Sequence, residues 1–153
     1  MTPSDPPRTA PTLYHERAPR NAGVRRESMQ ESEIMTNELN AKLAQYGIDY
    51  AEAMERFGGN EALFVRLASK YANDPHFDRL EAAMASGDTA AAEREAHSLK
   101  GVAGNLSFVR LYDLAARITD ALRADDLDSA RALMPELRES HEAVVEALAI
   151  LQG

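Results

Sequence analysis

Apolar residues recur at alternating spacings of four and three in the segment that follows Asp88. They are Ala92, Ala96, Leu99, Ala103 and Leu106. At the helical repeat of 3.6 residues per turn, this spacing brings all of them onto one side of an α-helix, as in the seam of a packed bundle. Alanine at most of these positions lets a neighbouring helix approach closely. The segment therefore predicts a helix buried along one side, which we call the alanine seam.

The same helical period continues through the chain from Ile34 onward, and no segment shows the alternating pattern of a strand. Short loops between antiparallel helices predict an all-α, up-down four-helix bundle with short N-terminal helices. Capping residues, glycines and prolines predict where the helices begin and end. The first is opened by Thr36 or Asn37 and ended by Gly47, and the next four run from Asp49 to Gly58, from Asn60 through Tyr71, from Pro75 to Gly87, and from Asp88 or Thr89 to Asn105. Ser107 is expected to cap a helix through Leu122, and Asp125 or Asp126 to open a last one through Leu151, which Pro135 would kink or split.

Residues 1–33 differ from this pattern. They contain several arginines and five of the seven prolines, and they show no apolar periodicity. We expect a disordered tail here, at least through Ala22, followed by a helical domain over residues 34–153. The tail has five basic and five acidic residues, so the formal net charge of -8 belongs to the helical domain.

The composition excludes several classes of protein. The absence of cysteine excludes a disulfide scaffold and thiolate chemistry. The net charge of -8 argues against binding nucleic acid through its phosphates. No apolar run approaches the ~20 residues that span a bilayer, and the N-terminus lacks the apolar stretch of a secretory signal. We therefore expect a monomeric cytoplasmic protein that binds neither nucleic acid nor membrane.

One histidine lies on the side of this predicted helix that faces away from the alanine seam. At 100° per residue, His97 lies about 140° from the centre of the alanine seam and faces solvent or a partner. Gly101, one turn later, costs the helix about 1 kcal/mol relative to alanine. Because the side chain at i+4 partly covers residue i, glycine there leaves one flank of the imidazole open. Lys100 and Gly104 share this side, and Gly104 is alternatively a C-cap before Asn105.

These positions favour phosphoryl chemistry at His97. An exposed neutral imidazole is a nucleophile near pH 7, and the Lys100 ammonium beside it favours the neutral ring and would stabilise a phosphoryl group attached to it. The chain has no Gly-rich nucleotide loop, so the phosphoryl group would come from another protein.

The other candidate groups have simpler explanations. No second histidine lies at zinc-ligand spacing from His97, so we expect no metal site. The acidic groups at 93–95 and 125–128 are interpreted as caps and solvated faces. The remaining histidines are expected to be ordinary solvated residues: His15, His76 and His141.

The segment resembles the histidine-containing phosphotransfer (HPt) domain of two-component phosphorelays. The family pattern is H-x-x-K-G-x-x-x-x-x-G, usually preceded by alanine, and it matches at Ala96, His97, Lys100 and Gly101. Ser107 stands where the pattern has its second glycine. The lead-in is also similar, at Gly47-Ile48-Asp49, Arg56-Phe57-Gly58-Gly59-Asn60, Phe77 and Gly87-Asp88, so that the resemblance covers roughly residues 44–150.

The resemblance implies that His97 accepts a phosphoryl group from the phosphoaspartate of one receiver domain and passes it to another. The receivers would belong to a hybrid histidine kinase or to response regulators, and they would supply the aspartate and Mg²⁺. This chain would need no cofactor and have no autokinase activity, with Lys100 stabilising the phosphate. Receiver docking would use Glu93, Arg94, Gly101 and Gly104. The alternative is a helical adaptor that binds a receiver or kinase without carrying phosphate.

Overall fold

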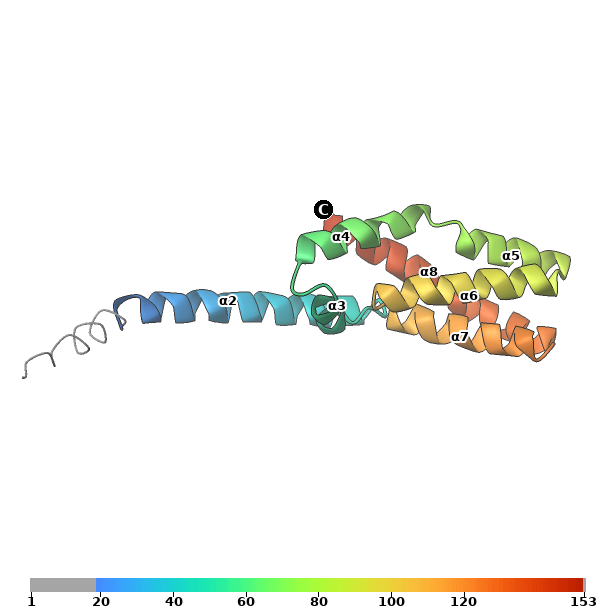
Figure 1. Ribbon diagram of the computed structural model, residues 1–153, viewed down its shortest axis with the longest axis horizontal. Helices are drawn as coiled ribbons and strands as arrows, with labels where there is room; N and C mark the ends of the chain where they lie inside the picture. Colours follow the sequence, from blue (N-terminus) through green and yellow to red (C-terminus); the bar gives the residue numbers. More distant parts are fainter. Residues whose placement is uncertain (1–18, 153) are drawn as a thin grey trace, which may run out of the picture. The chain divides into compact units, whose positions relative to one another are not determined.

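The computed structural model describes residues 19–152, which contain helices and no strand (Figure 1). Two compact units make up the chain, residues 1–38 and 39–153. The elements are α2 (Pro19–Ala44), α3 (Tyr50–Arg56), α4 (Glu61–Ser69), the 3-10 helix η2 (Lys70–Asn73), α5 (His76–Ser86), α6 (Thr89–Asn105), α7 (Val109–Arg123) and α8 (Leu127–Gln152). The predicted all-α class is confirmed.

Helices α5 to α8 form the four-helix bundle. Each packs against the next along the chain, and short turns make the neighbours antiparallel (Figure 1). The ring of Phe77 on α5 stacks on His141 of α8 with centroids 4.1 Å apart, and Arg138 of α8 pairs with Glu81 of α5, which closes the bundle. Helix α4 and η2 pack on α8. The predicted up-down bundle with short preceding helices is therefore confirmed.

The alanine seam is buried as predicted. Four of its five residues have no exposed surface, and Leu106 is 7% exposed. Helix α7 faces it with a buried apolar stripe that the sequence also predicts: Leu111, Leu114, Ile118 and Leu122. Because the seam occupies one side of α6, the opposite side is free to carry polar residues.

The predicted caps fix where most helices begin. Asp49, Asn60 and Asp88 accept backbone N–H donors of their own first turns at 3.0, 3.0 and 3.1 Å. Of the two candidates before α8, Asp126 is the cap, accepting from the backbone nitrogen of Ser129 at 3.1 Å. Each cap fixes where its helix begins, and the Asp88 cap fixes the start of α6 at Thr89.

Two expectations about helix boundaries are wrong. Helix α2 begins at Pro19 and runs through Thr36 and Asn37, so the described part of the expected tail is helical and neither residue is a cap. Proline is tolerated in a first turn, where its missing N–H would have no partner, and the residues that follow are mostly good helix formers. The apolar residues of this segment do not gather on one face, which is why periodicity missed the helix. The prolines at positions 3–11 lie outside the described residues.

The second correction concerns Pro135. It lies inside α8, which continues from Leu127 to Gln152 as one helix, so of the predicted kink or split the split does not occur, and the kink stays a prediction. Packing of both halves against the bundle compensates for the backbone hydrogen bond that proline cannot donate: Ala130 precedes it, Leu137 and Val144 follow it, and all three are fully buried.

Two histidines that we expected to be solvated instead link helices. His141 Nδ1 lies 2.7 Å from the Tyr71 hydroxyl, and its ring stacks on Phe77. His76 Nδ1 lies 2.7 Å from Glu95 Oε2, which joins α5 to α6. The error arose because their partners are distant in sequence. His15 lies outside the described residues.

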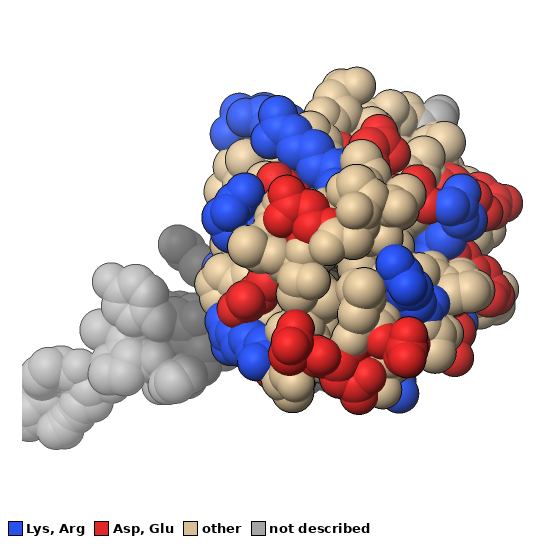
Figure 2. All heavy atoms as spheres, turned by 90° about the vertical axis from the view of Figure 1, so that its right-hand side faces the viewer, with Lys and Arg blue, Asp and Glu red and all other residues tan. Residues whose placement is uncertain are grey.

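No helix in the described part of the chain is both long and apolar enough to cross a membrane. The end of the bundle that carries the α5–α6 and α7–α8 turns shows acidic and basic side chains dispersed over a largely uncharged surface (Figure 2).

Truncation of the seam tests the packing. Leu99→Ala should lower the free energy of unfolding by about 2–5 kcal/mol, because the fully buried side chain leaves a cavity. Urea denaturation followed by circular dichroism measures the change. Val145→Ala, at a site 36% exposed, should change stability by less than about 0.5 kcal/mol. Equal losses in the two variants would contradict the assigned core.

His141 should make stability depend on pH. Burial lowers the pKa of His141 from its ordinary value of 6.5, although nearby carboxylates, chiefly Asp78, oppose this. The folded state therefore favours the neutral ring. The stabilisation is complete above the unfolded pKa of about 6.5 and is lost as the pH falls through it toward the folded pKa.

Urea denaturation of the wild type at pH 7.5 and pH 5 should therefore show lower stability at the acidic value. His141→Phe, which retains an aromatic ring against Phe77, should show a smaller loss between these pH values, whatever its absolute stability. An equal loss in both proteins would show that His141 is not responsible.

Candidate functional site

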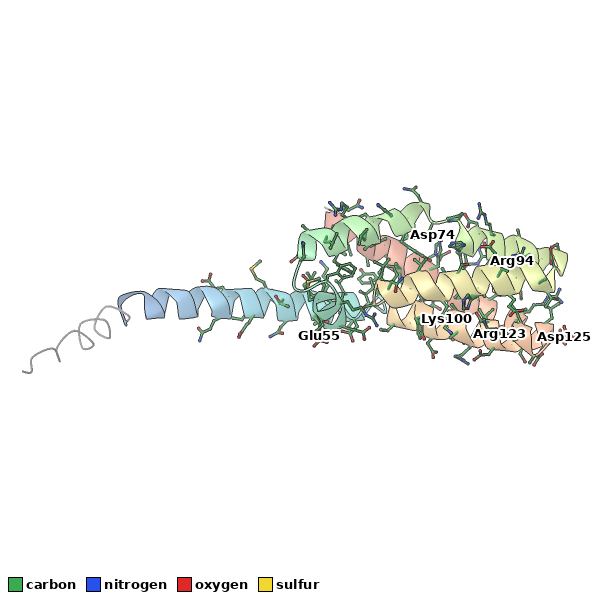
Figure 3. The ribbon with its side chains drawn as sticks, viewed as in Figure 1. Glu55, Asp74, Arg94, Lys100, Arg123 and Asp125 are labelled. Carbon is green, nitrogen blue, oxygen red and sulfur yellow. The ribbon has the colours of Figure 1, made fainter. Side chains whose placement is uncertain are left out.

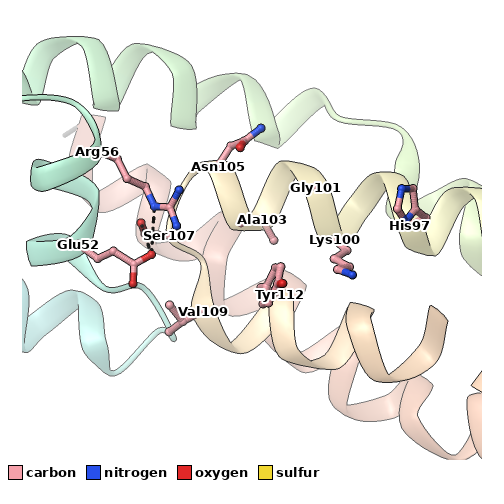
Figure 4. Close-up of a pocket in the computed structure, with 11 residues that line it drawn as sticks. Glu52, Arg56, His97, Lys100, Gly101, Ala103, Asn105, Ser107, Val109 and Tyr112 are labelled. Carbon is pink, nitrogen blue, oxygen red and sulfur yellow. Dashed lines mark hydrogen bonds and ion pairs between the residues drawn. The ribbon is translucent and has the colours of Figure 1, made fainter. Parts of the chain in front are cut away.

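His97 lies on the exposed side of α6, between two hollows in the surface, of which Figure 4 shows the larger. The larger, about 550 Å³, runs from His97 along α6 and the start of α7 toward α3. The smaller, about 340 Å³, lies on the other side of His97. It is lined by Ala90, Glu93, Arg94, His97 and Arg123. The imidazole is thus accessible from both sides along the helix.

The open flank predicted at Gly101 is present. A Cβ placed on Gly101 would have no atom within 4 Å beyond its own helix and chain neighbours. Gly104 differs, because a Cβ there would lie 3.1 Å from Cδ2 and 3.2 Å from Cε2 of Tyr112. Gly104 lies within α6, which continues to Asn105, and its φ is not positive, so it is not the C-cap. Glycine at this position admits the Tyr112 ring instead.

Lys100 shares the larger hollow with His97 but is directed elsewhere. Its Nζ lies 5.9 Å from the centre of the Tyr112 ring, within the range of a cation–π contact. No hydrogen bond joins Lys100 to His97 in the described structure. The ammonium therefore lies over the Tyr112 ring of α7 and not against the imidazole of His97.

Arg123 is the site residue that sequence reasoning missed. Its Nη2 lies 3.4 Å from His97 Nδ1, and its Nε lies 3.1 Å from Glu93 Oε1. Glu93, predicted to dock a partner, thus forms an ion pair within the protein, whereas Arg94 is exposed and lines the smaller hollow. Finding Arg123 from sequence would have required the register of α6 against α7.

Ser107 closes the far end of the larger hollow. Its φ is 58°, the left-handed conformation that favours glycine, which accounts for glycine in the family pattern at this position. The buried hydroxyl donates to Glu52 Oε1 at 3.2 Å, and the carbonyl accepts from the Asp49 nitrogen at 2.9 Å. The cap of α7 is Phe108, so the prediction that Ser107 caps this helix is wrong.

An apolar surface that sequence analysis did not locate adjoins the site. Val109 and Tyr112, both on α7 and both lining the larger hollow, are 41% and 42% exposed. Large apolar side chains exposed beside a hollow are typical of surfaces that bind another protein. Glu52 and Arg56, paired at 3.1 Å, form the charged rim at the α3 end.

Among the described residues, no three histidine, aspartate or glutamate side chains gather closely enough to hold a metal ion. Around His97 the structure places an exposed imidazole between two cationic side chains, Lys100 in the larger hollow and Arg123 in the smaller one.

Comparison with known families identifies the class of domain. The Hpt domain family matches residues 72–147, which include α5, α6, α7 and most of α8. The bundle that carries His97 therefore belongs to the Hpt domain family, whose members function in phosphotransfer during two-component signalling and interact with receiver domains and kinases. Neither curated proteins nor solved structures gave a significant match.

The two glycines of α6 should respond differently to alanine. Gly101→Ala should raise the free energy of unfolding by about 0.5–1 kcal/mol, since helix propensity improves and nothing obstructs the new methyl group. Gly104→Ala should gain less or lose stability, because Tyr112 must move. Urea denaturation compares them, and adding Tyr112→Ala to both should reduce their difference. Equal effects of the two single substitutions would contradict the assigned contact.

Proposed function

We propose that this protein relays phosphoryl groups between receiver-domain aspartates, with His97 as the phosphoryl acceptor. The proposal rests chiefly on the position of His97, exposed on the central helix of an Hpt-family bundle with an open flank at Gly101. The receivers belong to a hybrid histidine kinase or to response regulators.

The reaction at His97 is a displacement at phosphorus. A ring nitrogen attacks the aspartyl phosphate, the N–P bond forms, and the O–P bond breaks with its electron pair remaining on the carboxylate. The proton of the neutral imidazole passes to water, which balances the charge. Nε2 is the attacking atom, because Nδ1 is the nitrogen beside Arg123. The ring attacks in its Nδ1–H tautomer, which leaves the lone pair on Nε2, and once Nδ1 has lost its proton to water it can accept from Arg123. The reverse reaction transfers the group to the next receiver.

This chain supplies the nucleophile and the docking surface, and the receiver supplies the acidic residues and Mg²⁺. Lys100, held near Tyr112, can turn toward the phosphoryl group and pair with its oxygens. Val109 and Tyr112 provide the apolar part of the docking surface. Gly101 and Gly104 have no side chains, so the surface of α6 in the larger hollow stays open to a receiver. Glu93 and Arg94 border the opposite side of His97.

Substitution of the acceptor tests the proposal. Incubated with a phosphorylated receiver domain, wild-type protein should gain an acid-labile, base-stable phosphate, and His97→Gln should gain none while keeping its fold. The amide removes the nucleophilic nitrogen at an exposed position. His76→Gln is the matched control and should still be labelled, because His76 lies in the α5–α6 contact.

Labelling of His97→Gln at the wild-type level would overturn the assignment of the acceptor. Binding of receivers without labelling of the wild type by any of them would instead support an adaptor that carries no phosphate.

A further inference from the structure

Arg123 makes two contacts at once, through different nitrogen atoms. Nε meets Glu93 and Nη2 meets Nδ1 of His97, so the guanidinium bridges a carboxylate and an imidazole one helical turn apart on α6. Figure 3 shows Arg123 and Lys100 along the side of the bundle formed by α6 and α7. Both side chains of the ion pair are partly exposed, so the guanidinium is free to adjust to a new charge nearby.

The contact from Arg123 Nη2 to His97 Nδ1 limits which nitrogen of the imidazole can carry a proton. A guanidinium only donates hydrogen bonds, so the Nδ1 that it meets must carry a lone pair. An imidazole phosphorylated on Nε2 has that lone pair, together with the negative charge of the phosphoryl group. The Arg123 contact thus complements the phosphorylated ring in both hydrogen bonding and charge.

The same contact opposes loss of the phosphoryl group. Cleavage of the N–P bond is favoured when Nδ1 is protonated, because the ring then leaves as a neutral imidazole. A donor already at Nδ1 hinders that protonation. Glu93 acts in the opposite sense: its carboxylate lies one turn from His97, competes for Arg123 and repels a phosphoryl group.

Resting on the proposed function, we infer that the Glu93–Arg123 pair sets the phosphorylation equilibrium of His97. Arg123 is a phosphoryl-stabilising residue that favours phosphohistidine, and Glu93 is the counter-charge that limits this effect. The pair thereby determines how much phosphate the protein holds when it exchanges with a receiver at equilibrium.

The equilibrium distribution of phosphate between this protein and one receiver domain tests the inference. Both proteins are mixed at fixed concentration, and the phosphorylated fraction of each is measured by intact mass at neutral pH, because alkali hydrolyses the aspartyl phosphate and acid hydrolyses phosphohistidine. Because the equilibrium constant compares the free proteins, a substitution that only weakens docking slows the approach to equilibrium without moving it. The equilibrium constant therefore separates stabilisation of phosphohistidine from a merely structural role of the substituted residue.

Arg123→Ala should lower the equilibrium constant for phosphohistidine formation about two- to fivefold, the range of exposed charge pairs. Glu93→Gln should raise it by a similar factor, since the amide oxygen can still accept from Arg123 while the repelling charge is gone. The double variant restores the local charge balance and should fall between the single ones. Arg123→Lys should recover part of the loss, because it keeps the charge without the fork.

The exposed pair Asp113–Arg117 on α7 provides the matched control. Neither residue lines the hollows beside His97, so Arg117→Ala and Asp113→Asn should leave the equilibrium constant unchanged.

Failure of the inference and failure of the proposed function give different results. A wild type labelled normally, with no shift or same-direction shifts in Arg123→Ala and Glu93→Gln, would overturn the inference alone. A shift equal in the control pair would also overturn it, because the effect would then follow net charge. A wild type that no receiver labels would overturn the proposed function and the inference together.

Discussion

The close antiparallel packing of α6 against α7 is the contact on which the rest of the site depends. Gly104 admits the Tyr112 ring at one point, and Glu93 pairs with Arg123 at another. Between these points the chain moves eleven residues back along α6 and eleven forward along α7, which is about three helical turns on each. The register fixed by the glycine contact therefore carries Arg123 to His97. A shift of one turn would leave the histidine without a cation from α7.

One helix serves both stability and chemistry because its two sides are separated. The alanine seam is buried against the neighbouring helices, which leaves His97 on the opposite, exposed side of α6. The exposed side needs no packing, so it can carry a histidine and a glycine that a buried position would not accept. Exposure also suits a group-transfer site whose second reactant arrives on another protein, since a deep pocket would exclude that protein.

Much of the bundle could be predicted from the sequence, because it follows from local rules. The alanine seam, the Asp49, Asn60 and Asp88 caps and the open flank at Gly101 all depend on residues within a few positions of one another. Arg123 and the Val109–Tyr112 surface could not be predicted, since they depend on how α7 lies against α6. The N-terminal part of helix α2 was not predicted for a different reason: its residues favour a helix, but its apolar residues do not gather on one face.

Magnetic resonance can identify the atom of this protein that carries the phosphate. Protein labelled with ¹⁵N and phosphorylated by a receiver domain can be studied by ³¹P and ¹⁵N nuclear magnetic resonance, with His97→Gln to assign the ring. We expect a single phosphorus coupled to Nε2 of His97, with Nδ1 unprotonated and facing Arg123. Phosphorus on Nδ1 of His97, or on any other residue, would contradict it.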